Sequence, residues 1–105
     1  MLGELEQLVM LAVMRARDDA YGVSIRREIE ARTGRVLTLG TVHKTLSRLE
    51  DKQLLESHAG DPTPVRGGRS KRLFTVTRSG RIALRDSLEM TRRMARGLDL
   101  GWEGR

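Results

Sequence analysis

The chain has 105 residues, of which 20 are Lys or Arg and 14 are Asp or Glu, so its formal net charge at pH 7 is +6. This length supports one small domain, and the basic surplus suits a polyanion such as DNA, RNA or an anionic membrane surface. The lack of cysteine excludes disulfides and thiolate metal sites, and two histidines are too few for a metal cluster without several nearby carboxylates. Because no apolar run approaches about eighteen residues and the N-terminus lacks signal-peptide features, we expect a cytoplasmic protein without a membrane span.

The first predicted helix covers Glu4–Arg17 and is apolar on almost every side between Leu8 and Met14. A helix that is apolar all round is buried all round. In so small a domain one face can meet the protein's own core, and the other face needs a second partner. The next predicted helix covers Tyr21–Thr33, with one apolar stripe and one charged face, and ends before Gly34. Glycine commonly closes a helix in this way.

A third helix is predicted to begin with Thr38 as its N-cap and to run to about Lys52. Apolar residues spaced four and three apart define its buried face. The opposite face has short hydroxylic and basic side chains and no acid before Glu50. These side chains belong to Thr41, His43, Lys44, Thr45, Ser47 and Arg48. The third helix therefore has an apolar inner face and an outer face suited to nucleic acid.

The segment after the third helix predicts a β-hairpin with a long tip. Two short extended runs, Leu54–His58 and Lys71–Val76, flank a Gly-, Pro- and Arg-rich loop over Ala59–Gly68. The last part of the tip is basic, with Arg66, Arg69 and Arg72 beside Lys71.

A final helix is predicted from a Thr77 cap through about Gly97, with an apolar seam of the kind that packs against another helix. Together with the all-round apolar first helix, this seam predicts a homodimer. The expected interface residues are Leu5, Val9, Leu84, Leu88, Thr91, Ala95 and Leu98. Residues 1–77 are then the DNA-binding part, and residues 78–105 the dimerisation helix and its tail.

Three helices followed by a hairpin with a basic tip is the order of a winged helix-turn-helix, a mainly α fold with a small β-hairpin. In such folds the third helix enters the major groove, which is wide enough to admit it, and the hairpin follows the neighbouring backbone or minor groove. The candidate contacts with double-stranded DNA are Thr38, Thr41, His43, Lys44, Ser47, Arg48, Arg66, Arg69, Lys71 and Arg72.

From Leu2 to about Leu88 the sequence also resembles the PadR-like transcription regulators. The resemblance rests on six segments in order, Leu2–Glu6, Tyr21–Ile25, Leu39–Val42, Leu46–Glu50, Gly68–Arg72 and Phe74–Gly80. It implies a repressor of the short form, in which the single C-terminal helix forms the dimer near the partner's first helix. It also implies release from the operator by a small-molecule effector. His43 stands where the family usually has a tyrosine, and Leu73–Phe74 where it usually has two aromatic residues.

Other function classes find less support in the sequence. No serine lies in a G-x-S-x-G context and no glycine pattern marks a phosphate-binding loop, so we expect neither an enzyme nor a cofactor. The alternative is a winged helix used for protein–protein assembly or RNA binding. An assembly module would not need a basic third helix and a basic hairpin together, and the deep, narrow major groove of RNA does not admit a helix. Trp102 could stack on a flat effector, although a loosely packed tail residue is the simpler interpretation.

Overall fold

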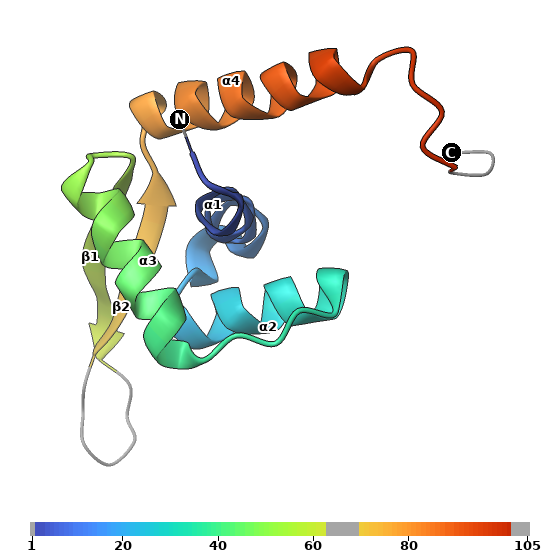
Figure 1. Ribbon diagram of the computed structural model, residues 1–105. Helices are drawn as coiled ribbons and strands as arrows, with labels where there is room; N and C mark the ends of the chain where they lie inside the picture. The colour runs from blue at the N-terminus through green and yellow to red at the C-terminus, as the bar shows by residue number, and fades with distance from the viewer. Residues whose placement is uncertain (1, 63–69, 102–105) are drawn as a thin grey trace.

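The computed structural model describes residues 2–62 and 70–101. Three helices, α1 (Glu4–Ala16), α2 (Gly22–Thr33) and α3 (Leu39–Asp51), are followed by the strands β1 (Leu55–Pro62) and β2 (Ser70–Val76) and by the helix α4 (Arg78–Ala95). A short 3-10 turn, η1 (Arg17–Asp19), separates α1 from α2. Figure 1 shows the hairpin beside α3 and α4 lying across α1 before it projects away from the body. The predicted winged helix-turn-helix architecture is confirmed.

The core forms where α1, α2, α3 and the base of the hairpin meet. Its largest fully buried side chains come from all four of these elements. They are Met10, Ile25, Leu46, Leu49, Leu55, Val9 and Val42. Close-packed aliphatic side chains of this kind supply most of the stability of a small domain. The hairpin is further attached to the body because the N–H of Phe74 donates to the carbonyl of Ala20 at 2.9 Å.

The two predicted threonine caps are confirmed. The hydroxyl of Thr38 accepts from the N–H of Thr41 at 3.1 Å, and the hydroxyl of Thr77 accepts from the N–H of Gly80 at 2.9 Å. Such caps satisfy backbone donors that the first turn of a helix leaves unpaired. Gly34 closes α2 with a φ of 74°, as its position after the charged helix predicts.

The hairpin differs from the prediction in the length of its first strand. We expected this strand to end at His58, but β1 continues to Pro62. The register shifts between Ala59, which pairs with Arg72, and Pro62, which pairs with Ser70. Three steps on β1 therefore face two on β2, which is a β-bulge. Bulges admit proline and an extra residue without ending the strand, so this Gly- and Pro-containing segment was wrongly assigned to the loop.

The last helix is shorter than predicted because α4 ends at Ala95 and Gly97 has a left-handed φ of 84°. Leu98 therefore follows the helix and does not continue the seam by helical spacing. In the described ranges, 2–62 and 70–101, no helix is long and apolar enough to cross a membrane.

Candidate nucleic-acid interface

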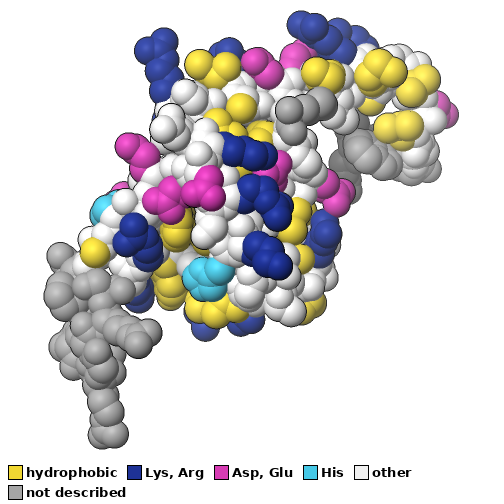
Figure 2. All heavy atoms as spheres, turned by 60° about the vertical axis from the view of Figure 1, so that its left-hand side comes forward, with side chains coloured by type: hydrophobic (Ala, Val, Ile, Leu, Met, Phe, Trp, Pro, Cys, Tyr) yellow, Lys and Arg dark blue, Asp and Glu magenta, His cyan; other side chains and the backbone are white. Residues whose placement is uncertain are grey.

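The outer face of α3 presents most of the side chains that the sequence predicts. Thr45 was wrongly placed there, because it is buried and its hydroxyl donates to the carbonyl of Thr41 at 2.9 Å. Val42, Leu46 and Leu49 are buried, whereas an exposed row on the other side contains His43, Lys44, Ser47 and Arg48. Figure 2, which turns the hairpin side of the molecule forward, shows basic side chains across the middle of this face, with acidic side chains beside them. This exposed face has the charge and the hydrogen-bonding groups that contacts with phosphates and base edges require.

The two threonines at the start of α3 are already engaged with each other. The hydroxyl of Thr38 donates to the hydroxyl of Thr41 at 2.8 Å, in addition to accepting from its N–H. Thr38 is exposed and Thr41 is half-buried. Their first role is therefore to begin the helix. A contact of either hydroxyl with DNA has to use the lone pairs of its oxygen that these capping bonds leave free.

His43 lies against the N-terminal end of α2. A Cβ placed on Gly22 would lie 2.7 Å from Cε1 and 2.9 Å from Nε2 of the His43 ring, closer than such atoms approach. Gly22 is buried, and its missing side chain is what lets the imidazole pack there. The histidine is thus held at the corner between α2 and α3, although it remains exposed on the outer side.

The basic residues at the root of the hairpin are held by neighbouring protein groups. The ammonium of Lys71 lies 4.2 Å from the centre of the Tyr21 ring and 4.0 Å from a carboxylate oxygen of Asp19. The guanidinium of Arg72 donates through Nε to the hydroxyl of Ser57 at 3.0 Å. These roles of Tyr21, Asp19 and Ser57 could not be predicted, because each residue is distant in sequence from its partner. Arg66 and Arg69, which we predicted as contacts, lie outside the described residues.

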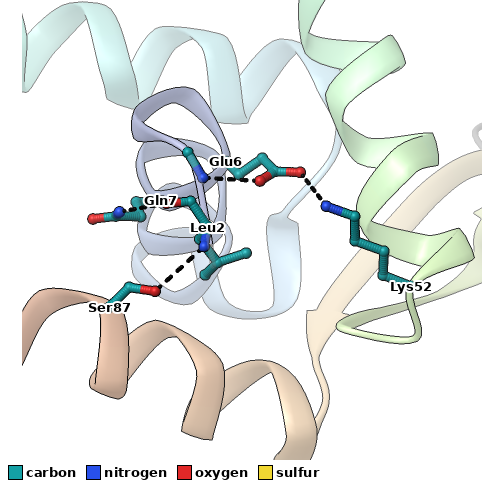
Figure 3. Close-up of polar contacts among 6 residues, drawn as sticks. Leu2, Glu6, Gln7, Lys52 and Ser87 are labelled. Carbon is teal, nitrogen blue, oxygen red and sulfur yellow. Dashed lines mark hydrogen bonds and ion pairs between the residues drawn. The ribbon is translucent and has the colours of Figure 1, made fainter. Parts of the chain in front are cut away.

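The far end of α3 is tied to α1 by a nearly buried acid. Oε2 of Glu6 accepts from the ammonium of Lys52 at 2.9 Å, and Oε1 accepts from the N–H of Gly3 at 3.0 Å (Figure 3). Burial alone would raise the pKa of Glu6. The two hydrogen bonds and the positive charges of Lys52 and Arg48 outweigh burial and hold this pKa below its ordinary value. The carboxylate thereby links the C-terminal end of α3 to α1.

The same N-terminal segment touches α4. The N–H of Leu2 donates to the hydroxyl of Ser87 at 3.5 Å, and Leu2 itself is buried (Figure 3). Helices α4 and α3 are thus connected through residues 2–6, a link that we did not anticipate from sequence.

The predicted dimer residues divide into two groups in the structure. Val9 and Leu84 lie in the protomer's own core, with 0% and 4% of their surfaces exposed, so they have almost no surface left for a partner. Leu88 is 41% exposed and lines a groove of about 480 Å³ between α1 and α4, together with Leu11 and Met14. Much of the exposed apolar surface lies along this groove and the second half of α4. The residues of the predicted set that are at least partly exposed are Leu5, Leu88, Thr91, Ala95 and Leu98.

No group of three or more histidine, cysteine or acidic side chains in ranges 2–62 and 70–101 could hold a metal ion. The site consists of the exposed face of α3 and the root of the hairpin, and the molecule also has a groove between α1 and α4.

Comparison with known proteins identifies the family. The sequence matches the transcriptional regulator PadR-like family over residues 10–86. The chain belongs to this family. Members of the PadR family are DNA-binding regulators rather than enzymes, and this chain has the same function.

Individual relatives agree with this assignment. A PadR family transcription regulator from Clostridium difficile is 25% identical, with a TM-score of 0.68 over 85% of this chain and 88% of its own. A PadR family transcriptional regulator from Eggerthella lenta is 26% identical, with a TM-score of 0.67 over 90% of this chain and 81% of its own. An uncharacterized protein from Lysinibacillus sphaericus is 26% identical over 104 residues, which cover 97% of this chain and 91% of that protein.

Proposed function

We propose that this PadR-family chain is a repressor that binds operator DNA as a homodimer. In this proposal α3 enters the major groove with His43 and Lys44 near the base edges, and the hairpin follows the adjacent backbone. The observation that carries the proposal is the exposed basic and hydroxylic face of α3, with the hairpin root holding Lys71 and Arg72 beside it. Residues 1–77 would form the DNA-binding part, and the rest of the chain the assembly element.

The homodimer is supported by the apolar surface that one copy leaves exposed. On α4, Leu88 is 41% exposed and Met94 is 77% exposed. The groove beside α1 has an apolar floor with charged side chains around it, and its lining residues are Leu11, Met14, Leu84 and Leu88 with Arg81, Arg85, Glu89 and Arg92. Figure 1 shows the second half of α4 extending beyond the three-helix body. Contiguous exposed apolar surface of this kind marks an interface, and two-fold pairing is the commonest way to bury it.

Sedimentation of a matched pair of variants tests the dimer. Leu88→Glu places a carboxylate in the groove, whereas Ile82→Glu changes a residue of the same helix that is equally exposed, at 42%, but does not line the groove. Burying one unpaired carboxylate per protomer costs about 2 kcal/mol or more. Two of them should raise the dimer Kd by roughly 10³-fold. The parent and Ile82→Glu should sediment as dimers at micromolar concentration and Leu88→Glu as a monomer. A monomeric parent would end the proposal.

Duplex binding is tested through its dependence on salt. If two protomers together contact about 6 to 10 phosphates, affinity should fall roughly 10³- to 10⁵-fold between about 50 and 200 mM salt. A DNA duplex from the chain's own promoter is compared with an RNA duplex of matched sequence. A flat salt response would favour a protein partner, and equal binding of the RNA would favour the RNA alternative.

A small-molecule effector is also part of the proposal. We place its binding site in the groove between α1 and α4, which is lined by residues of both helices, among them Leu11 and Leu88. A molecule bound there would alter the spacing between the two copies of α3 in the dimer. Trp102, which we considered as a stacking residue, lies outside the described residues.

A further inference from the structure

A chain of two hydrogen bonds joins the reading helix to both strands of the hairpin. The hydroxyl of Ser57 on β1 donates to Oε2 of Glu50 on α3 at 2.5 Å. The same hydroxyl accepts from Nε of Arg72 on β2 at 3.0 Å. Figure 1 shows that these three elements lie side by side. One small hydroxyl therefore stands between an acid and a guanidinium from three different elements.

Ser57 separates two charges that would otherwise attract each other directly. Within the described residues, Arg72 and Glu50 form no ion pair with each other, although both are hydrogen-bonded to the Ser57 hydroxyl oxygen. A hydroxyl can donate to a carboxylate and accept from a guanidinium at the same time, so it links the two groups while keeping them apart. Toward the residues that the structure describes, Arg72 uses only Nε, and its side chain is exposed. Its two terminal nitrogens have the geometry for a bidentate contact with phosphate.

We propose that Ser57 is a positioning residue for DNA binding, which presents the guanidinium of Arg72 to a backbone phosphate and prevents its capture by Glu50. The inference rests on the proposed function, because it requires that the hairpin lies on duplex DNA. Without the hydroxyl, Arg72 turns toward the Glu50 carboxylate and forms a direct ion pair. The acid then takes the place that the phosphate would occupy, and one phosphate contact per protomer is lost.

The size of the effect follows from counterion release. Each phosphate contact makes affinity vary with salt to a power of about −0.9, so at about 0.15 M salt one contact contributes roughly fivefold. A dimer that loses two contacts should bind about 30-fold more weakly, with a salt slope reduced by nearly two units. Because a phosphate contact is independent of sequence, a random-sequence DNA duplex is a sufficient probe.

Four variants separate positioning from a general loss of structure. Ser57→Ala should show the full loss of affinity, and Ser57→Thr, which keeps a hydroxyl and suits a strand, should bind like the parent. Glu50→Gln removes the competing carboxylate and should bind at least as tightly as the parent. Ser57→Ala combined with Glu50→Gln should recover most of the lost affinity. Binding is measured by fluorescence anisotropy over a salt series, and the urea unfolding midpoint of each variant is measured in parallel.

The outcomes distinguish this inference from the function on which it rests. Recovery of affinity by Glu50→Gln in the alanine variant supports the inference, since a merely structural serine would not depend on the charge of Glu50. Equal losses with and without Glu50, or a Ser57→Ala variant that binds like the parent, overturn it. If Ser57→Ala does not fold, Glu50→Gln alone decides, because weaker binding by that variant also overturns it. A parent chain that binds no duplex overturns the proposed function as well.

Discussion

The turn that ends α3 contains a residue that the local backbone disfavours. The N–H of Gln53 donates to the carbonyl of Glu50 at 2.9 Å, and the N–H of Leu54 donates to the carbonyl of Leu49 at 3.0 Å. These two bonds form a Schellman motif, whose central residue is left-handed and usually glycine. Here it is Gln53, with a φ of 63°. Replacing this exposed glutamine by glycine should therefore stabilise the protein.

The expected gain is the difference between two terms. The left-handed conformation costs a residue with a Cβ about 1–2 kcal/mol. Glycine loses roughly 0.5–1 kcal/mol more conformational entropy on folding, which offsets part of that gain. The net stabilisation for Gln53→Gly is about 0.5–1 kcal/mol. For a domain of this size it should raise Tm by roughly 2–8 °C.

Gly34 provides the matched control for this substitution. Its φ is 74°, and nothing lies within 4 Å of the position that a Cβ would take, so Gly34→Gln introduces only the backbone penalty that Gln53 already carries. The two variants should shift the thermal midpoint in opposite directions by similar amounts, measured by circular dichroism at one fixed protein concentration. The concentration is fixed because the proposed dimerisation would make Tm depend on it. If Gln53→Gly leaves Tm unchanged or lowers it while Gly34→Gln lowers Tm, the left-handed strain at Gln53 is not as we infer.

Three further outcomes are expected. Gly22→Ala should displace the His43 ring, because the added methyl group would meet the far end of that ring, which can move. The preference for operator over scrambled duplex should then change, while Tm shifts by only a few degrees. An unchanged preference would exclude base reading by His43. Gly80→Ala should destabilise by about 1–3 kcal/mol in urea unfolding, because its Cβ would meet the Leu54 carbonyl oxygen, a backbone atom. The pKa of Glu6 is lower in the folded protein than its ordinary value of 4.5, so its ionised carboxylate stabilises the fold above pH 4.5. This stabilisation is lost as pH falls through the lower pKa of the folded state. The urea midpoint should therefore drop more on acidification in the parent than in Glu6→Gln.

Features that depend on neighbouring residues in the chain could be predicted from the sequence. Thr38 and Thr77 cap helices because their hydroxyls reach a backbone N–H three residues ahead, at Thr41 and Gly80, so the pattern alone contains the interaction. The exposed row on α3 follows in the same way from helical spacing. These local signals located the helices and the candidate reading face.

Interactions that join distant parts of the chain could not be predicted in this way. Glu6 interrupts an apolar helix, and nothing near it indicates that its partner is Lys52, 46 residues away. Ser57 is one of several serines, and only the fold brings it between Glu50 and Arg72. Val9 was assigned to the dimer interface for the same reason, although it lies in the protomer's own core. Helical spacing shows that a side chain faces apolar surroundings, but it does not show whether those surroundings belong to the same copy of the chain.

The basic side chains of the candidate interface differ in how far the protein has already ordered them. At the root of the hairpin, Tyr21 and Asp19 hold Lys71, and Ser57 holds Arg72. Immobilising a long cationic side chain costs about 0.5–1.5 kcal/mol on binding, and contacts that exist before binding remove much of that cost. Side chains placed in advance suit phosphates, whose spacing is the same in every sequence, whereas base edges vary and are better read by exposed groups such as Lys44 on α3. In the complex that we propose, the described part of the hairpin would therefore set the position of the protein along the duplex, and α3 would be left free to choose the sequence.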